Sequence, residues 1–261
     1  MDTAPTPAGP TTFADLHRPG DPLVLPNAWD VGSARAFVAA GFAAVGTTSL
    51  GVAASHGLVD GTGSDRDHTV ALASDLVAAH LGCPVTVDLA DGYSTDPGRV
   101  AELVAGLGVA GVNLEDSTAG VLVDPAVHAA RLLAVRDRAP GVFVNARTDV
   151  LWLGGTDLDE AVDRLRRYAD AGADGVFLPG ATDPAAIERD VAAVDRPLNV
   201  LATPALPLSR LAALGVARVS TGSLPYRAAL RAAVLAATAT RDGLALPEAV
   251  GYVQVQALHG G

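Results

Sequence analysis

The stretch VTVDLADGYS, residues 85–94, contains two acids at the end of an apolar run. Asp88 and Asp91 lie three positions apart, and Gly92 follows them. A short apolar run rich in Val is typical of a buried strand. Two acids at the point where such a strand leaves the core indicate either a solvated turn or a place where a cation is bound.

Two later apolar runs also end in charged residues, Glu115 in GVNLEDS and Arg147 in FVNARTD. If these runs are neighbouring parallel strands, the carboxylates of Asp88 and Glu115 converge, and their repulsion is costly unless a cation or proton intervenes. Oxygen ligands without His or Cys nearby favour Mg²⁺ or Mn²⁺, completed by waters and substrate oxygens. The Arg147 guanidinium can bind a carboxylate or a phosphonate through paired hydrogen bonds. The alternative is that the acids cap the following helices and that Arg147 pairs with Asp149.

Asp88, Glu115 and Arg147 can form one site only if the fold brings the ends of their strands together. The sequence shows such a fold through one pattern that it repeats four times. A helical end, a glycine and a short apolar strand follow one another in AAGFAAVGTTS, GLGVAGVNLED, DAGADGVFLPG and AALGVARVSTG. Each glycine occupies the position that commonly ends a helix. Four further apolar runs lie between these passages. Eight strands are therefore expected, near residues 23–25, 43–46, 85–88, 111–114, 142–145, 175–178, 198–201 and 218–220.

Apolar strands that alternate with helices predict a parallel sheet, and eight such units predict a single (β/α)8 barrel of the TIM type. The predicted organisation is an N-terminal segment (1–20), the barrel (21–240) and a C-terminal extension (241–261). A doubly wound open sheet is the alternative, but no G-x-G-x-x-G follows the first strand. Residues that follow barrel strands line the active site. This places Trp29 in the pocket, unless it packs at the start of the next helix.

The composition excludes several classes of function. A net charge of -11 without basic runs argues against nucleic acids and anionic membranes as partners. All 18 basic residues are Arg, so no lysine is present for a Schiff base, a pyridoxal phosphate anchor or a P-loop. The single Cys83 precludes an internal disulfide and a cysteine-based zinc cluster. No signal peptide or long apolar segment is seen, and we expect a cytoplasmic protein.

Five blocks, in this order and spread over residues 23–225, resemble the isocitrate lyase/phosphoenolpyruvate mutase (PEP mutase) superfamily. The blocks are LPNAWDVGSARAFVAAGFAAVGTTSLGVAASHGLVDG, VTVDLADGYS, GVNLEDS, FVNARTDVLWLGG and YADAGADGVFLPG. The resemblance implies a Mg²⁺-dependent barrel that acts on small 2-oxo or 2-hydroxy acids through an enolate, with the metal as a Lewis acid. It also implies a homo-oligomer, a dimer or tetramer, in which the helix around YRAALRAAVLAATATR is exchanged between subunits. The alternative is an intramolecular helix.

The resemblance also assigns roles to individual residues. By position, Asp88 and Glu115 look like the metal-site acids of the superfamily, and Arg147 looks like its substrate-carboxylate arginine. Asp60 lies where the mutases and phosphonopyruvate hydrolases place an aspartate beside the reacting centre, so Asp60 and Arg147 are the expected catalytic residues. The carboxylate or phosphonyl end of the substrate is expected on the backbone amides of three successive residues, Thr48, Ser49 and Leu50.

The chain departs from the superfamily pattern in three places. Ala90 stands where a second metal-site acid is usual, so either Asp91 takes over that role or metal affinity is reduced. The Lys-Lys-Cys-Gly-His loop of the isocitrate and methylisocitrate lyases is absent, and so is the long gating loop of the mutases after NLEDS. We therefore expect a lyase or hydrolase that cleaves a C–C bond in an oxaloacetate- or malate-like acid. The alternatives are P–C bond chemistry of the phosphonopyruvate hydrolase or PEP mutase kind and a catalytically weak barrel that binds small acids.

Overall fold

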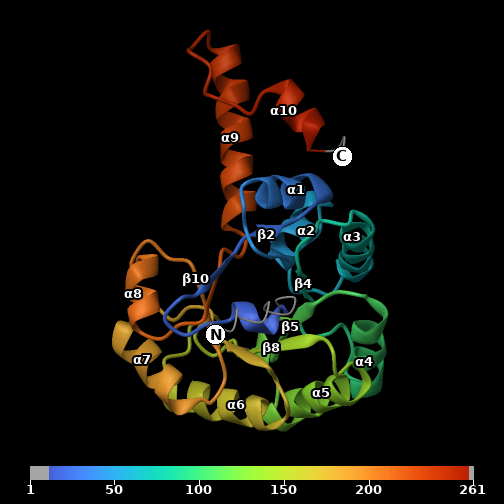
Figure 1. The fold of residues 1–261 in the computed structure, drawn as a ribbon, viewed down its shortest axis with the longest axis vertical. Coiled ribbons are helices and arrows are strands. Elements are labelled where there is room, and N and C mark those ends of the chain that lie inside the picture. The colour runs from blue at the N-terminus through green and yellow to red at the C-terminus, as the bar shows by residue number, and fades with distance from the viewer. Residues whose placement is uncertain (1–11, 259–261) are drawn as a thin grey trace, which may run out of the picture.

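The computed structural model describes residues 12–258 and is built around one sheet of nine parallel strands (Figure 1). Most of these strands are rich in Val, Leu and Ala, as expected for strands covered by helices on one side and by the barrel interior on the other. The strands are β1 (Leu23–Leu25), β2 (Asn27–Ala28), β3 (Val45–Thr47), β4 (Val85–Asp88), β5 (Gly111–Glu115), β8 (Phe143–Arg147), β9 (Gly175–Phe177), β10 (Leu198–Leu201) and β11 (Arg218–Ser220).

The sheet closes into a barrel through its first strand, which is split in two. The strand order is β1-β11-β10-β9-β8-β5-β4-β3-β2, and only Pro26 separates β1 from β2. Proline has no N–H to donate, but its carbonyl accepts a hydrogen bond of 2.8 Å from the backbone N–H of Gly46 on β3. The (β/α)8 barrel prediction is confirmed, with all eight strand positions present and the first of them broken at Pro26.

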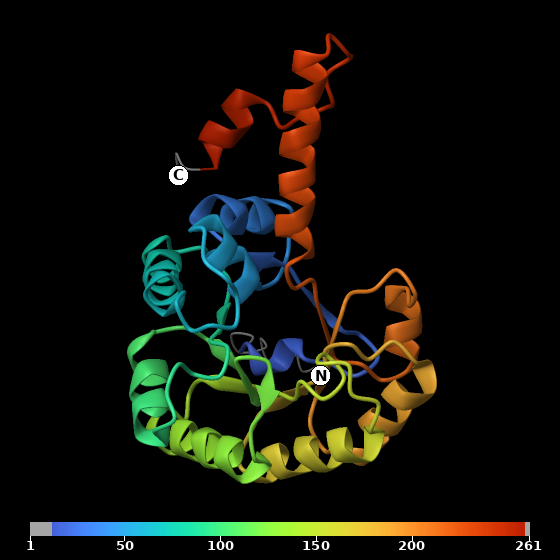
Figure 2. The same ribbon diagram turned by 180° about the vertical axis from the view of Figure 1, so that it is seen from behind.

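Helices surround the sheet on its outer face (Figures 1 and 2). They are α1 (Val31–Ala39), α2 (Ser49–Ser55), α3 (Arg66–Ala78), α4 (Pro97–Gly106), α5 (Pro125–Arg138), α6 (Leu158–Asp170), α7 (Pro184–Ala193) and α8 (Leu208–Ala213). Five of them begin after an aspartate whose side chain accepts a backbone N–H of the first turn, namely Asp30, Asp96, Asp124, Asp157 and Asp183. Other acids than Asp88 and Glu115 therefore cap these helices.

An antiparallel hairpin of β6 (Ser117–Thr118) and β7 (Val121–Leu122) lies between β5 and α5. The sequence pattern did not predict it, because two-residue strands are too short for a hydrophobic period to be visible. The hairpin follows directly from Glu115 and Asp116, so its position depends on the same strand end that carries the predicted metal ligand.

At one end of the barrel the interior is closed by the short helix η1 (Ala14–Leu16) and its neighbours. Phe13 packs against Phe143 with ring centroids 5.4 Å apart, and His17 stacks on Phe143 at 4.2 Å. The part of the predicted N-terminal segment from residue 12 onward thus covers this end of the barrel. Residues 1–11 lie outside the described part of the chain.

The C-terminal part projects from the barrel (Figures 1 and 2). Helix α9 (Leu224–Arg241) extends outward, and α10 (Tyr252–Ala257) turns back toward α1, where Arg35 Nη1 donates a hydrogen bond of 2.7 Å to the carbonyl of Leu258. Large apolar side chains on α9 are exposed, namely Leu224, Leu230, Val234 and Leu235. None of the helices within residues 12–258 combines the length and the apolar character needed to cross a bilayer.

Candidate active site

A cavity of about 860 Å³ opens at the carboxyl ends of the parallel strands. Its charged wall is formed by the ends of β4, β5 and β8 and by the chain after α2, and its acidic residues are Asp60, Asp88, Glu115 and Asp149. The ends of β10 and β11 and the start of α9 contribute apolar and hydroxyl side chains such as Leu201, Thr221 and Leu224 and, among the described residues, no carboxylate. The carboxylates of the cavity therefore gather on one wall, which is called the acidic half below, and the rest of the lining combines apolar side chains with hydroxyls and Arg227.

Arg147 lies in the middle of the acidic half. Its Nη1 is 2.9 Å from Glu115 Oε2, and its Nε is 2.5 Å from Asp149 Oδ1. Glu115 and Arg147 are register partners on β5 and β8, so the pairing of the strands brings them together. The guanidinium carbon also lies 5.6 Å from the ring centroid of Phe177 and 5.8 Å from that of Trp152. Arg147 thus forms the alternative pair with Asp149 and at the same time reaches the cavity beside Glu115.

The carboxylates of this wall are electrostatically crowded. Burial raises the pKa of Asp88, and it raises the pKa of Glu115 well above its usual value; Arg147 opposes both shifts, while neighbouring acids add to them. Burial acts to lower the pKa of Arg147, but the charges of Glu115, Asp149 and Asp88 raise it overall. Because four carboxylates face this single guanidinium, their mutual repulsion favours the uptake of a proton or a cation on this wall.

The donor set fits Mg²⁺. This ion is often held by one or two carboxylates, with waters and substrate oxygens completing the shell. Asp88 and Glu115 lie on the adjacent strands β4 and β5, and both line the cavity. Among residues 12–258 no group of three or more His, Cys, Asp or Glu side chains is arranged to hold a metal ion. The protein would therefore supply two carboxylates to a partly hydrated ion, and not a closed cage of the structural zinc type.

Asp60 and the start of α2 form the wall next to Asp88. Burial raises the pKa of Asp60, and a hydrogen bond from Ser49 acts against this shift. Thr48 caps α2, since its Oγ1 accepts the backbone N–H of Gly51 at 3.5 Å. Thr48, Ser49 and Leu50 all line the cavity. The structure therefore brings most of the predicted site residues into one cavity, namely Thr48, Ser49, Leu50, Asp60, Asp88, Glu115 and Arg147.

Trp29 lies elsewhere, although a strand end precedes it. It is not among the residues that line the cavity. Its ring packs edge to face on Tyr226 of α9, with centroids 5.3 Å apart, and its backbone N–H donates to Ser33 Oγ at 3.2 Å. The packing alternative describes this geometry better than the pocket position, because Trp29 contacts Tyr226 and Ser33 beside the start of α1 and does not contact the cavity.

Asp91 is also not among the residues that line the cavity. Its Oδ2 accepts a hydrogen bond of 2.6 Å from Thr118 on the hairpin, and its Oδ1 accepts the backbone N–H of Tyr93 at 2.9 Å. Ala90 has a φ of +48°, in the left-handed region, where the chain turns after the strand. Local hydrogen bonds therefore hold the Asp91 carboxylate between the hairpin and the backbone of Tyr93.

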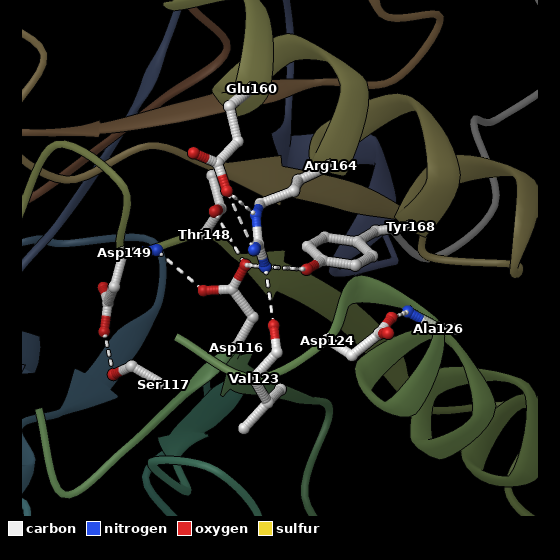
Figure 3. A network of polar contacts seen from close by, with 10 residues as sticks. All are labelled: Asp116, Ser117, Val123, Asp124, Ala126, Thr148, Asp149, Glu160, Arg164 and Tyr168. Carbon is white, nitrogen blue, oxygen red and sulfur yellow. Dashed lines mark hydrogen bonds and ion pairs between the residues drawn. The ribbon is translucent and has the colours of Figure 1, made fainter. Parts of the chain in front are cut away.

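A buried network lies behind Asp149 and connects the cavity to α6 (Figure 3). The Asp116 carboxylate accepts four hydrogen bonds, from Thr148 Oγ1 (2.8 Å), the Asp149 backbone N–H (2.9 Å), the Tyr168 hydroxyl (2.6 Å) and Arg164 Nη1 (3.1 Å). Arg164 Nη1 also donates to the carbonyl of Val123, and Ser117 Oγ donates to Asp149 Oδ2 at 2.6 Å. The network thus fixes both the hairpin and Asp149, which in turn binds Arg147.

The model of the phosphoenolpyruvate phosphomutase family matches residues 13–241. The chain belongs to this family. Among its relatives is Uncharacterized protein Rv1998c of Mycobacterium tuberculosis H37Rv, which is 51% identical over 247 residues, or 94% of this chain and 95% of that protein.

Solved structures agree with the family assignment. A candidate lyase/mutase from Burkholderia cenocepacia J2315 superposes with a TM-score of 0.87 and 38% identity, covering 96% of this chain and 95% of that one. A 2,3-dimethylmalate lyase, described as a PEP mutase/isocitrate lyase superfamily member, superposes with a TM-score of 0.77 and 29% identity, over 93% and 90%. The resemblance seen in the sequence is confirmed, and the protein is an enzyme of this superfamily of carbon–carbon lyases and mutases.

Sequence reasoning missed several cavity residues of this family member. Ser117 belongs to the unpredicted hairpin, and Trp152 and Phe177 belong to the wall around Arg147. Asn113 lies within β5, two residues before Glu115, and lines the cavity although it is almost fully buried. The sequence does contain a signal for it, since an amide in the middle of an apolar strand needs a partner or a ligand.

Proposed function

We propose that the protein is a Mg²⁺-dependent enzyme that cleaves a C–C bond in a small 2-oxo or 2-hydroxy dicarboxylic acid of the oxaloacetate or malate kind. The observation that carries this proposal is the convergence of Asp88, Glu115 and Arg147 in one cavity at the barrel mouth, with Arg147 Nη1 2.9 Å from Glu115. Two carboxylates for a cation and one guanidinium for an anion are the groups that such a substrate and its metal require.

Each of the predicted residues that line the cavity has a task that its position supports. Asp88 and Glu115 would hold Mg²⁺, which when bound acts as a Lewis acid toward the oxo oxygen of the substrate. Arg147 uses Nε and Nη1 for Asp149 and Glu115, which leaves its Nη2 group to bind a substrate carboxylate. Asp60, on the same wall, would carry a proton to or from the substrate. The backbone amides of Thr48, Ser49 and Leu50 would receive the second acidic end.

The relatives support C–C cleavage. One solved relative is named as a 2,3-dimethylmalate lyase, and dimethylmalate is a substituted malate. Cys83 precedes β4 at the opposite end of the strand from the cavity and is not among the residues that line it. A mechanism in which cysteine serves as the acid or base therefore has no support from this geometry, and Asp60 is left as the proton carrier.

A second candidate is a barrel that binds small acids without efficient chemistry. It is favoured by one observation, that Ala90 replaces an acid and Asp91 is bonded to Thr118 and Tyr93 instead of facing Glu115. With two carboxylates the metal site would be weaker than with three, because each carboxylate adds to the attraction for the cation.

The test is an assay of the full chain, stripped with a chelator and reloaded with Mg²⁺. Oxaloacetate, malate and alkyl-substituted malates would be supplied, and the products followed by proton NMR. The proposal predicts C–C cleavage that requires Mg²⁺ and is lost in Asp88→Asn. Binding of these acids without turnover would favour the second candidate, and neither binding nor turnover would contradict both.

A further inference from the structure

Inside the barrel, next to the cavity, lies a buried arginine without an ion-pair partner among residues 12–258. Arg218 on β11 has no exposed surface. Its Nε donates to Ser220 Oγ at 3.0 Å and its Nη2 to Asn113 Oδ1 at 3.2 Å, while Nη1 has no partner among the described residues. Burying an unpaired cation is unfavourable for folding. This position is therefore a candidate for a role other than stability.

The charge of Arg218 determines which atom of Asn113 it contacts. Burial lowers the pKa of the guanidinium to about 9, against the effect of the Asp88 carboxylate, so the group is protonated at neutral pH. A guanidinium offers only donors. The Asn113 atom that it contacts is therefore the carbonyl oxygen and cannot be the amide nitrogen.

A second donor fixes the same oxygen. Asn145 Nδ2 donates to Asn113 Oδ1 at 2.9 Å, and Asn113 and Asn145 are register partners on β5 and β8. With two N–H groups on Oδ1, the Asn113 carboxamide has one favourable orientation, in which Nδ2 points away from both donors. No hydrogen bond joins this Nδ2 to the described residues, and it is not among the buried polar atoms that lack a partner. Since Asn113 lines the cavity, its free N–H groups open into that space.

Asn113 is a neighbour of the two predicted metal-binding acids, Asp88 and Glu115. Residues two apart on a strand face the same side, so Asn113 lies on the same face of β5 as Glu115. It is also the register partner of Asp88 on β4. An N–H donor here is therefore a neighbour of Asp88 across the sheet and of Glu115 along the strand, where an oxygen of a bound acid is expected.

We propose that Asn113 is a substrate-binding residue whose amide N–H binds an oxygen of the acid, and that Arg218 is the positioning residue that orients it. This inference rests on the proposed function, because the proposed ligand is the acid that the metal site recruits. Arg218 does not contact the ligand itself and acts through the carbonyl oxygen of Asn113.

Calorimetric titration of oxalate into the Mg²⁺-loaded protein tests the proposal. Asn113→Leu keeps the size of the side chain and removes the donor, and we expect its Kd for oxalate to rise about 10-fold or more, as for a lost hydrogen bond to a charged group. Thr86→Val is the matched control. Thr86 is buried in β4, its Oγ1 has no partner, and it does not line the cavity, so Kd is expected to stay within about twofold.

A double-mutant cycle separates positioning from a structural role. Arg218→Lys replaces the two fixed donors Nε and Nη2 with a single ammonium on a flexible stem, and we expect the Kd of this variant to rise several-fold in the wild-type background. In the Asn113→Leu background the same change is expected to add less than about twofold, because the group it orients is gone. Independent, multiplicative losses would show that Arg218 acts on the fold, and would overturn its positioning role.

The remaining outcomes are distinct. Oxalate binding by the wild type that is unchanged in Asn113→Leu overturns the inference and leaves the proposed function standing. Absence of Mg²⁺-dependent oxalate binding in the wild type overturns the proposed function and this inference with it. If the variants do not fold, NMR of the wild type decides: the side-chain amide protons of Asn113 should move downfield when oxalate is added, and unmoved resonances would contradict the contact.

Discussion

The Arg147 side chain is fixed in position by four neighbouring side chains. Asp149 and Glu115 fix its guanidinium from two sides, and Phe177 and Trp152 flank it. Only 12% of the side chain is exposed, so little water competes with a bound carboxylate. A planar fork with five donors can serve two acids and a substrate together.

Replacing Arg147 with Lys should therefore damage substrate binding. One ammonium cannot reach Glu115, Asp149 and a carboxylate in the geometry of the fork, and we expect KM for the cleaved acid to rise at least about 10-fold. Steady-state kinetics measure this. Arg136→Lys, at a pair with Asp174 that does not line the cavity, should leave KM unchanged. An unaltered KM in Arg147→Lys would show that this arginine is structural.

At the scale of elements, the hairpin of β6 and β7 is held by a buried ion pair. Arg164 on α6 binds Asp116, which has no exposed surface, and the carbonyl of Val123 at the end of the hairpin. The hairpin in turn lines the cavity with Ser117. The position of the hairpin at the cavity therefore depends on α6, although no residue of α6 lines the cavity.

Arg164→Met should lower the free energy of unfolding by about 3 kcal/mol, because it leaves Asp116 buried without its cation. Urea denaturation measures this value. Arg167→Met, at an exposed position of the same helix, is the control and should change stability by less than about 0.5 kcal/mol. A loss in Arg164→Met no larger than in the control would argue against the ion pair as the support of the hairpin.

The main elements and much of the site could be predicted from the sequence alone, for a physical reason. Strands buried on both faces are continuous apolar runs, and in a barrel their carboxyl ends meet, so the order of the runs was enough to group Asp88, Glu115 and Arg147. The same continuity hides which residues face inward, and Asn113 was missed for that reason. Asp91 and Trp29 follow strand ends but are not among the residues that line the cavity, because local contacts with Thr118 and Tyr226 decide their direction, and such contacts are not periodic.

At the scale of the whole molecule, two buried histidines make stability depend on pH. Burial lowers the pKa of His17 and of His128 to about 4. For His128, Arg131 and Arg164 add to the effect of burial, while Asp116 opposes it. In the unfolded chain these histidines take up a proton near pH 6.5. In the folded protein they take it up only near pH 4.

The contribution of these two histidines to stability should therefore be fully present above pH 6.5 and should fall as the pH drops from about 6.5 to 4, because each of them binds its proton more readily in the unfolded chain. Each histidine can contribute up to about 3 kcal/mol to the fall. Urea denaturation at pH 7.5, 6 and 5 measures it, and His128→Leu should flatten the curve. Equal slopes for wild type and variant would contradict the assignment to His128.

The projecting helix α9 bears on assembly. Its apolar side chains Leu230 and Val234 are exposed, and the helix extends away from its own barrel (Figure 1), as expected for an element that packs on another subunit. We expect light scattering to give a multiple of 26.2 kDa. Leu230→Asp with Val234→Asp should reduce the mass toward the monomer. A monomeric wild type would contradict the exchange of this helix.

The most direct test of the central claim is a calorimetric titration of Mg²⁺ into the chelator-stripped protein, with and without oxalate. A site that offers Mg²⁺ only two carboxylates predicts weak binding of the ion alone. Binding should be much tighter when oxalate completes the coordination shell. Asp88→Asn and Glu115→Gln should each weaken binding at least several-fold. No heat with either ligand, or affinities unchanged in both variants, would contradict a metal site at Asp88 and Glu115.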